Sequence, residues 1–212
     1  MSAYDLEEQE QLAELKAWWK ENGNKLISLA ALVLFVIAAW NGWNWYQRSQ
    51  AAQAAALYDT LQKAARANDL KTVRDTAGSI LEKYARTAYA PLAALISAKS
   101  HFQAADAKTA RAQLEWAVEH TRSDELRATA ALRLAEVLLD DGALDAALKA
   151  LDTKPPVSFD ALFAAMRGDI FVAQKKTAEA REAYKLALEK AGVTGSALRD
   201  SVRIKLDALG TN

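Results

Sequence analysis

Few residues in this chain have the type and spacing that catalysis or metal binding requires. It contains two histidines, His101 and His120, and no cysteine, so no thiolate or cysteine–histidine cluster is available to hold a metal ion. The adjacent carboxylates Asp140 and Asp141 would need a pocket to act as acid and base, and nothing around them indicates one. Ser196 lies at the start of a predicted helix and not in a nucleophile-bearing turn. We therefore expect a packed imidazole at His101, a surface imidazole at His120, and a non-enzymatic protein without a cofactor or metal ion.

The elements that position these residues are predicted to be helices. The chain has only 8 glycines and 3 prolines in 212 residues, and alanine and leucine are abundant. This composition favours an all-helical fold. The 27 basic and 27 acidic residues cancel, so there is no net positive charge to attract nucleic acid. The sequence therefore predicts an all-α protein that does not bind nucleic acid.

One segment, 26–47, contains no charged residue and is bounded by Lys25 and Arg48. A helix of this length extends roughly 33 Å, about the thickness of the bilayer's hydrocarbon core. Tryptophans, which prefer the membrane–water interface, flank it on both sides; they are Trp18, Trp19, Trp40, Trp43 and Trp45. The competing interpretation is a signal peptide cleaved near 52–54, which fits less well because this small-residue pattern lies far behind the apolar run. We predict a transmembrane helix over 26–47, embedded in the lipid bilayer.

Basic residues predict how this helix is oriented. Three lysines precede it closely, whereas Arg48 is the only basic residue just after it. The three are Lys16, Lys20 and Lys25. Because basic residues are retained on the cytoplasmic side, we expect a short cytoplasmic tail over 1–25. In a bacterium the large domain, 48–212, is then periplasmic and is anchored to the inner membrane.

One face of the predicted span carries small residues at helical spacing. Small side chains let another helix approach closely, which is a common basis of helix association in membranes. The alternative is that small residues are simply frequent in such helices. The predicted docking face for a partner helix consists of Ser28, Ala31, Ala38 and Gly42.

After the span, hydrophobic periodicity predicts short amphipathic helices separated by turn residues. They cover residues 50–67, 70–85, 88–104, 107–120, 124–140, 143–152, 158–174, 177–191 and 196–209. Successive helices of this length are typical of an α-solenoid built from repeated pairs. We expect about four helix pairs, with the last helix closing the stack as a polar cap.

The clearest repeat lies within 161–194. Small residues and aromatic residues alternate there at the spacing of a tetratricopeptide repeat, in which small residues allow helices to cross closely and aromatics fill the gaps. These residues are Gly168, Phe171, Ala180, Tyr184 and Ala187. The pattern recurs upstream, and alanines spaced by 33, 37 and 33 residues mark the second helix of each pair: Ala77, Ala110, Ala147 and Ala180.

Two places depart from a regular repeat. Four extra residues near 120–125 predict either a longer loop or a longer helix end. Pro155 and Pro156 predict a shortened second helix in the third repeat, because proline cannot continue a helix.

A solenoid presents the first helices of its pairs on a concave surface. On this pattern the surface combines apolar side chains with charges of both signs, which suits an extended or loosely folded polypeptide. The predicted surface consists of Leu95, Lys99, Phe102, Leu132, Glu136, Leu139, Asp169 and Val172. The alternative is that Leu132, Leu139 and Val172 form ordinary core between repeats.

The N-terminal sequence resembles the start of a known family. Its EEQ run and its LKAWWKENG stretch look like those of the YfgM-like family, ancillary subunits of the bacterial Sec translocon. A single span followed by tetratricopeptide-like repeats extends the likeness over essentially the whole chain. The resemblance implies an inner-membrane protein that faces the periplasm and associates with the Sec channel and with a membrane-anchored periplasmic chaperone of the prolyl-isomerase type.

The resemblance also implies a function. Such a protein passes secretory or membrane polypeptides from the channel to periplasmic folding factors, and the family has been linked to negative control of an envelope-stress response. The family has no catalytic residues to transfer to this chain. The alternative function is that of a structural scaffold, which links envelope complexes and binds no client polypeptide.

Overall fold

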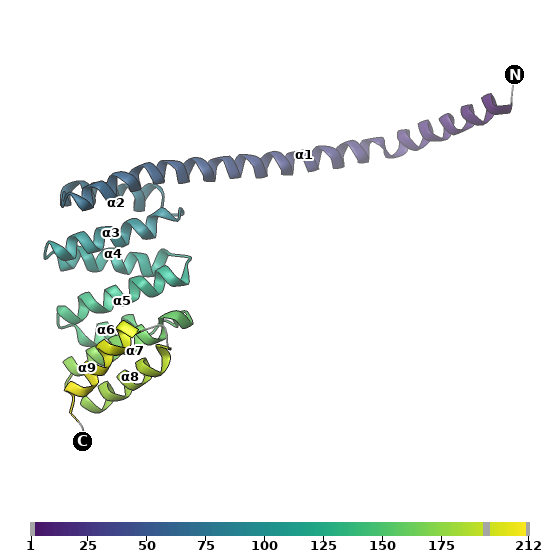
Figure 1. The fold of residues 1–212 in the computed structure, drawn as a ribbon. Coiled ribbons are helices and arrows are strands. Elements are labelled where there is room, and N and C mark those ends of the chain that lie inside the picture. Colours follow the sequence, from purple (N-terminus) through teal and green to yellow (C-terminus); the bar gives the residue numbers. More distant parts are fainter. Residues whose placement is uncertain (1–2, 193–195, 211–212) are drawn as a thin grey trace. The chain divides into compact units, whose positions relative to one another are not determined.

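The computed structural model of the protein describes residues 3–192 and 196–210. The described residues form α-helices, one short 3-10 helix and turns, with no strand among them, which confirms the all-α prediction. The chain divides into two compact units, Met1–Gln50 and Ala51–Asn212. The second unit contains the helix pairs and is the part shown at the lower left of Figure 1.

Helix α1 (Ala3–Arg66) carries the predicted transmembrane segment. It is long and apolar enough to cross a membrane, judged by length and composition. We predicted a separate helix from residue 50, but α1 continues without a break to Arg66. The reason is local, because the sequence between Gly42 and Arg66 contains neither glycine nor proline to end the helix.

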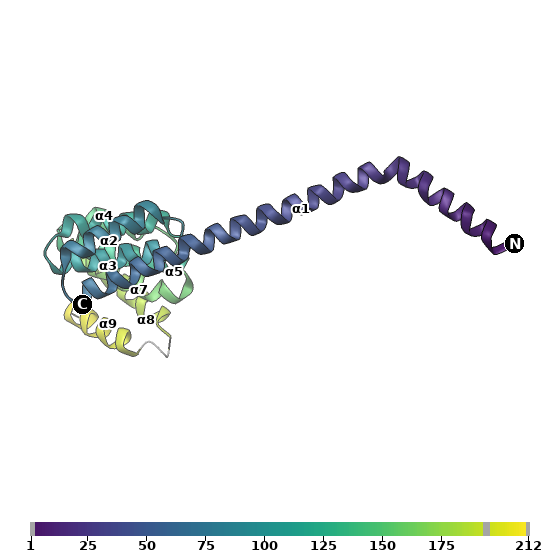
Figure 2. The same cartoon turned by 90° about the horizontal axis from the view of Figure 1, so that it is seen from above.

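The remaining helices follow the predicted series, with bounds within about two residues of those expected. They are α2 (Leu70–Lys83), α3 (Tyr89–Gln103), α4 (Ala107–His120), α5 (Asp124–Asp140), α6 (Leu144–Ala150), α7 (Asp160–Ala173), α8 (Thr177–Lys190) and α9 (Ser196–Ala208), with the 3-10 helix η1 (Val157–Phe159) before α7. In Figure 1 helices α2 to α8 follow one another down the stack in chain order, and α9 crosses in front of α7; in the turned view of Figure 2, α9 lies at the edge of the domain. This arrangement is the predicted solenoid.

The turn inside each helix pair has the same backbone geometry. One residue of each turn has a positive φ: Asn68, Ala105, Gly142 and Lys175. The residue after it donates its amide hydrogen to the carbonyl oxygen of the residue five positions before the donor. Two examples are the bond from Asp69 to Ala64 (3.0 Å) and the bond from Asp106 to His101 (2.9 Å). These are the helix-ending bonds of a Schellman motif. The four turns therefore define the repeat register, at spacings of 37, 37 and 33 residues.

This register shows that the predicted alignment of the first repeat was wrong. The alignment matched Ala77 with Ala110, but the turns place Val73 opposite Ala110 and Ala64 opposite His101. An error of four residues moves a helix by about one turn and leaves the same face directed at the core. In an alanine-rich helix the side-chain pattern therefore fits both registers, and only the turn geometry distinguishes them.

The core is made largely of alanine, which lets the helices lie close together. The last pair contains a close approach of this kind, where a Cβ atom on Gly168 would overlap the ring of Tyr184. In the third pair α6 ends at Ala150, ahead of the two prolines, and the fully buried Leu151 and the half-buried Phe159 complete the core. The shortened helix agrees with the prediction.

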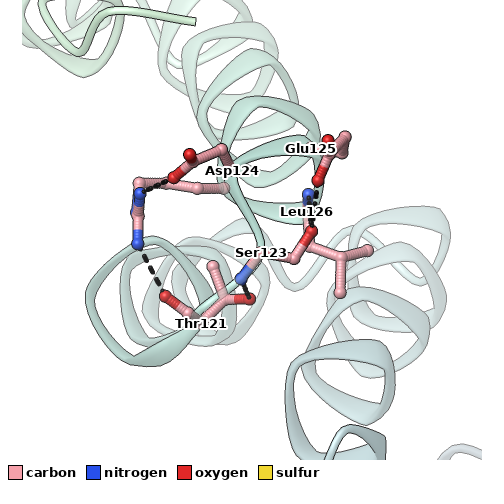
Figure 3. Close-up of polar contacts among 6 residues, drawn as sticks. Thr121, Ser123, Asp124, Glu125 and Leu126 are labelled. Carbon is pink, nitrogen blue, oxygen red and sulfur yellow. Dashed lines mark hydrogen bonds and ion pairs between the residues drawn. The ribbon is translucent and has the colours of Figure 1, made fainter. Parts of the chain in front are cut away.

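Helices α4 and α5 are joined by a short turn held by side-chain hydrogen bonds (Figure 3). Ser123 Oγ accepts a bond from the Leu126 amide at 3.2 Å and so caps α5. The Arg127 guanidinium donates to the Thr121 carbonyl oxygen at 2.7 Å and pairs with Asp124. The extra length predicted here lies in a helix and not in a loop, since α5 has 17 residues and α7 has 14, but the turn spacing of 37 residues is already present one repeat earlier.

The last helix, α9, closes the stack. Its Val202 is buried against α7 and α8. The guanidinium of Arg199 donates hydrogen bonds to the carbonyl oxygens of Leu188 (3.1 Å), in the last turn of α8, and of Gly192 (3.2 Å), just beyond the helix. The other side of α9 is polar apart from the exposed Ile204, as expected of a cap.

Candidate functional site: the face of the first helices

The predicted binding surface is built by the first helices of three successive pairs. Helix α3 contacts α5, and α5 contacts α7, so the three helices lie next to one another in the stack. We call their predicted surface the first-helix face. Its residues are Leu95, Lys99 and Phe102 on α3, Leu132, Glu136 and Leu139 on α5, and Asp169 and Val172 on α7.

The apolar residues of the first-helix face divide into two groups. Phe102 is 36% exposed and Val172 is 42% exposed, so both present apolar surface to solvent. Leu95, Leu132 and Leu139 are half-buried and pack against the core between the repeats. The exposed pair is available to a partner, whereas the leucines also hold the helices together.

Two of the charged residues on this face are already paired. The carboxylate of Asp169 lies 2.7 Å from Nζ of Lys205 on α9 and accepts a hydrogen bond from the Tyr184 hydroxyl, also at 2.7 Å. Glu136 pairs with Arg133 at 2.7 Å. The charge of Asp169 therefore links the cap to the last pair.

Burial of the Tyr184 side chain, followed by its hydrogen bond to Asp169, raises the pKa of the tyrosine hydroxyl. The tyrosine therefore stays protonated and continues to donate to the carboxylate well into the alkaline range.

Sequence reasoning did not identify the partners of these carboxylates. Arg133 and Glu136 are three residues apart on one helix, so their pairing has a signal in the sequence. Lys205 and Asp169 are 36 residues apart, and only the packing of α9 onto α8 and α7 brings them together. Lys99 is exposed and has no ion-pair partner among the described residues.

The two histidines have structural contacts. His101 is fully buried, and its Nδ1 lies 2.9 Å from the Asp106 carboxylate at the start of α4. Two hydrogen bonds from Thr109 and the contact with His101 lower the pKa of Asp106. His120 is exposed and stacks on Trp116, with ring centroids 4.5 Å apart. Within 3–192 and 196–210, no three His, Asp or Glu side chains are grouped as metal binding requires.

The predicted docking face of the span lies on the first unit. Its four residues, Ser28, Ala31, Ala38 and Gly42, are all exposed. A Cβ atom at Gly42 would meet no atom within 4 Å. This side of α1 therefore has the open space that a second helix needs, and its use as a docking face stays a prediction.

Comparison with known proteins places this geometry in a family. Residues 16–211 match the tetratricopeptide repeat-like domain family. The chain is 34% identical to the "Ancillary SecYEG translocon subunit" of Haemophilus influenzae, covering 98% of this chain and 100% of that protein. It is 33% identical to the protein of the same name from Neisseria gonorrhoeae (98% and 99% covered) and 28% identical to that from Escherichia coli (95% and 96%).

These matches extend over nearly the whole chain, including α1, and are not confined to the repeats. The likeness first seen in the N-terminal tail is thereby confirmed, and so is the tetratricopeptide-like fold. A family of translocon subunits built on interaction repeats agrees with the expectation of a non-enzymatic protein. The chain therefore belongs to the YfgM-like family of ancillary SecYEG translocon subunits.

Proposed function

We propose that this protein is a non-enzymatic ancillary subunit of the Sec translocon in the bacterial inner membrane. The observation that carries the proposal is the match over nearly the whole length to two relatives named ancillary SecYEG translocon subunits. The apolar segment of α1 supports it, because a subunit of a membrane channel needs a membrane anchor. In this proposal the anchor packs against a helix of the channel through its small-residue face.

The second part of the proposal concerns the repeat domain. It receives secretory or membrane polypeptides as they leave the channel and passes them to a membrane-anchored periplasmic chaperone of the prolyl-isomerase type. The exposed Phe102, Val172 and Lys99 on the first-helix face support this role, since scattered apolar and charged contacts suit extended chains of varied sequence. Control of an envelope-stress response is a further role that such a subunit would perform through a response regulator.

The orientation completes the proposal. The lysines before the span, compared with the single Arg48 after it, favour a cytoplasmic N-terminus and a periplasmic repeat domain. The scaffold function is the alternative, in which the repeats contact only folded envelope complexes.

Purification from membranes separates these functions. The tagged full-length protein, extracted in mild detergent after crosslinking in cells, should copurify with the Sec channel, the chaperone and exported polypeptides in transit. The Phe102→Glu variant should lose the exported polypeptides and retain the channel, because the anchor is unchanged. Recovery of folded envelope complexes without the channel or exported chains would support the scaffold and contradict the proposal.

A further inference from the structure

A second surface of the repeat domain has the features of a binding site. It is a groove of about 720 Å³ between α6, α7 and α8. Its apolar part includes Phe171 and Leu186, and its polar part consists of Asp152, Arg167, Glu179 and Glu182. Leu186 is 41% exposed, so the groove presents apolar surface that nothing in the described chain covers.

This groove is not the first-helix face. At about 100° per residue, Arg167 and Phe171 each lie about 160° around α7 from Asp169, and Phe171 lies about 100° from Val172. A ligand in the groove would therefore leave the first-helix face accessible.

The groove lies beside the shortened helix of the third pair. Helix α6 has 7 residues, whereas its counterpart α8 has 14. A second helix of full length would continue past Ala150, but Pro155 and Pro156 prevent it. Asp152, just after the helix end, forms part of the groove wall. The missing turns leave a groove whose walls are helices, and side-chain ridges of this kind are surfaces on which helices pack.

The charges around the groove select the kind of helix. Three carboxylates line it, and the one cation, Arg167, donates to the carbonyl oxygen of Leu151 at 2.8 Å. Glu182 pairs with Lys185, but Asp152 and Glu179 have no ion-pair partner among the described residues. An acidic rim around an apolar floor attracts lysine and arginine and repels phosphate groups and acidic segments such as the chain's own N-terminal tail.

The geometry points to a docking site for an amphipathic helix of a partner protein, with an apolar stripe against Phe171 and Leu186 and with lysine or arginine beside Asp152 and Glu179. This helix would occupy the space of the turns that α6 lacks. The site gives the repeat domain a contact with a folded partner that is separate from the first-helix face and does not depend on which side of a membrane the domain lies.

A designed peptide tests this site directly. The probe is a fluorescent peptide of about four helical turns, with leucine at every third or fourth position and lysine on both flanks of that stripe. The reference peptide has glutamate in place of each lysine. Fluorescence anisotropy with the full-length protein in mild detergent should give an affinity for the lysine peptide about tenfold or more above that for the glutamate peptide.

Variants locate the binding. Glu179→Lys should weaken binding of the lysine peptide about tenfold, since attraction becomes repulsion, and Leu186→Ser should weaken both peptides. Glu189→Lys is the matched control: it lies on the same helix outside the groove and should leave both affinities unchanged. Circular dichroism checks that each variant keeps its helices.

Four results would overturn the inference. The first three are no binding of the lysine peptide, equal binding of the two peptides, and binding that is insensitive to Glu179→Lys. The fourth is a dimer in sedimentation that Glu179→Lys dissociates, which would mean that a second copy of the chain fills the groove.

Discussion

At the scale of single residues, a small set of side-chain contacts holds the last helix pair and α9 together. The ring of Tyr184 lies over Gly168, and its hydroxyl donates to Asp169, which also binds Lys205. The Gly–Tyr spacing was visible in the sequence because it follows the repeat pattern. The Asp169–Lys205 pair was not, because no local rule relates residues that only tertiary packing brings together. Asp169, which we predicted as part of the binding surface, thus also holds α9 against the last pair through Lys205.

The contact between Gly168 and Tyr184 gives the first prediction. Gly168→Ala should lower the free energy of unfolding by about 1–3 kcal/mol, because the added methyl group overlaps the tyrosine ring in a packed interior. Gly78→Ala is the control: nothing lies within 4 Å of its Cβ position on α2, so the variant should gain about 0.5–1 kcal/mol from helix propensity. Urea unfolding followed by circular dichroism measures both. Equal effects at the two positions would contradict the packing argument.

The Tyr184 hydroxyl gives a prediction about pH. Its pKa is higher in the folded protein than in the unfolded chain, where it is about 10. The stabilisation that the protonated Tyr184 hydroxyl contributes is therefore complete below pH 10. It is lost as the pH rises toward the pKa of this hydroxyl in the folded protein, because the unfolded chain releases the proton first. Tyr184→Phe should be less stable than the parent by about 1 kcal/mol at pH 8. The difference should shrink above pH 10, and a constant difference across this range would refute the assignment.

At the scale of elements, the sequence predicts which helices form better than how they align. Hydrophobic periodicity and turn residues located α2 to α9 to within about two residues. The register of the first pair was wrong because alanine-rich faces match equally well after a shift of one turn. The continuation of α1 past residue 50 was missed because a change of composition was taken as a helix boundary, although no helix-breaking residue is present there.

The turns that set this register can be tested at Ala105, which has a φ of 61°. A residue with a side chain is strained in this conformation and glycine is not, so Ala105→Gly should raise the free energy of unfolding by about 0.5–1 kcal/mol. The neighbouring Ala104 has a φ of −88°, and Ala104→Gly should instead lower the free energy of unfolding by about 0.5 kcal/mol. Denaturant unfolding of both variants measures these opposite changes. A loss of stability in both variants would contradict the register defined by the turns.

At the scale of the whole molecule, a helix long and apolar enough to cross a membrane precedes a repeat domain with two candidate binding surfaces. The anchor, the solenoid and the family were predictable from the sequence, because a charge-free segment, a repeated pattern and a characteristic tail are all local features. The groove beside α6 was not, although the two prolines that cause it were noted. Its carboxylates come from two segments that only the packing of α6 and α8 onto α7 brings to one site.

The proposed orientation can be tested by labelling, since the chain contains no cysteine. Gln11→Cys and Glu189→Cys each introduce one thiol at an exposed position. In intact spheroplasts a membrane-impermeant maleimide should label the Glu189→Cys variant, and it should label the Gln11→Cys variant only after lysis. The reverse pattern would place the repeat domain in the cytoplasm.

Binding of exported polypeptides by the first-helix face at the Sec translocon is the main part of the proposed function. The most direct measurement places a photo-crosslinking amino acid at Phe102 and, as a control, at Val157, an apolar residue that is even more exposed (85%) but lies outside this face. In growing cells Phe102 should form adducts with exported polypeptides, and Val157 should form few. Absence of exported polypeptides from the Phe102 adducts, or equal adducts from both positions, would contradict the account.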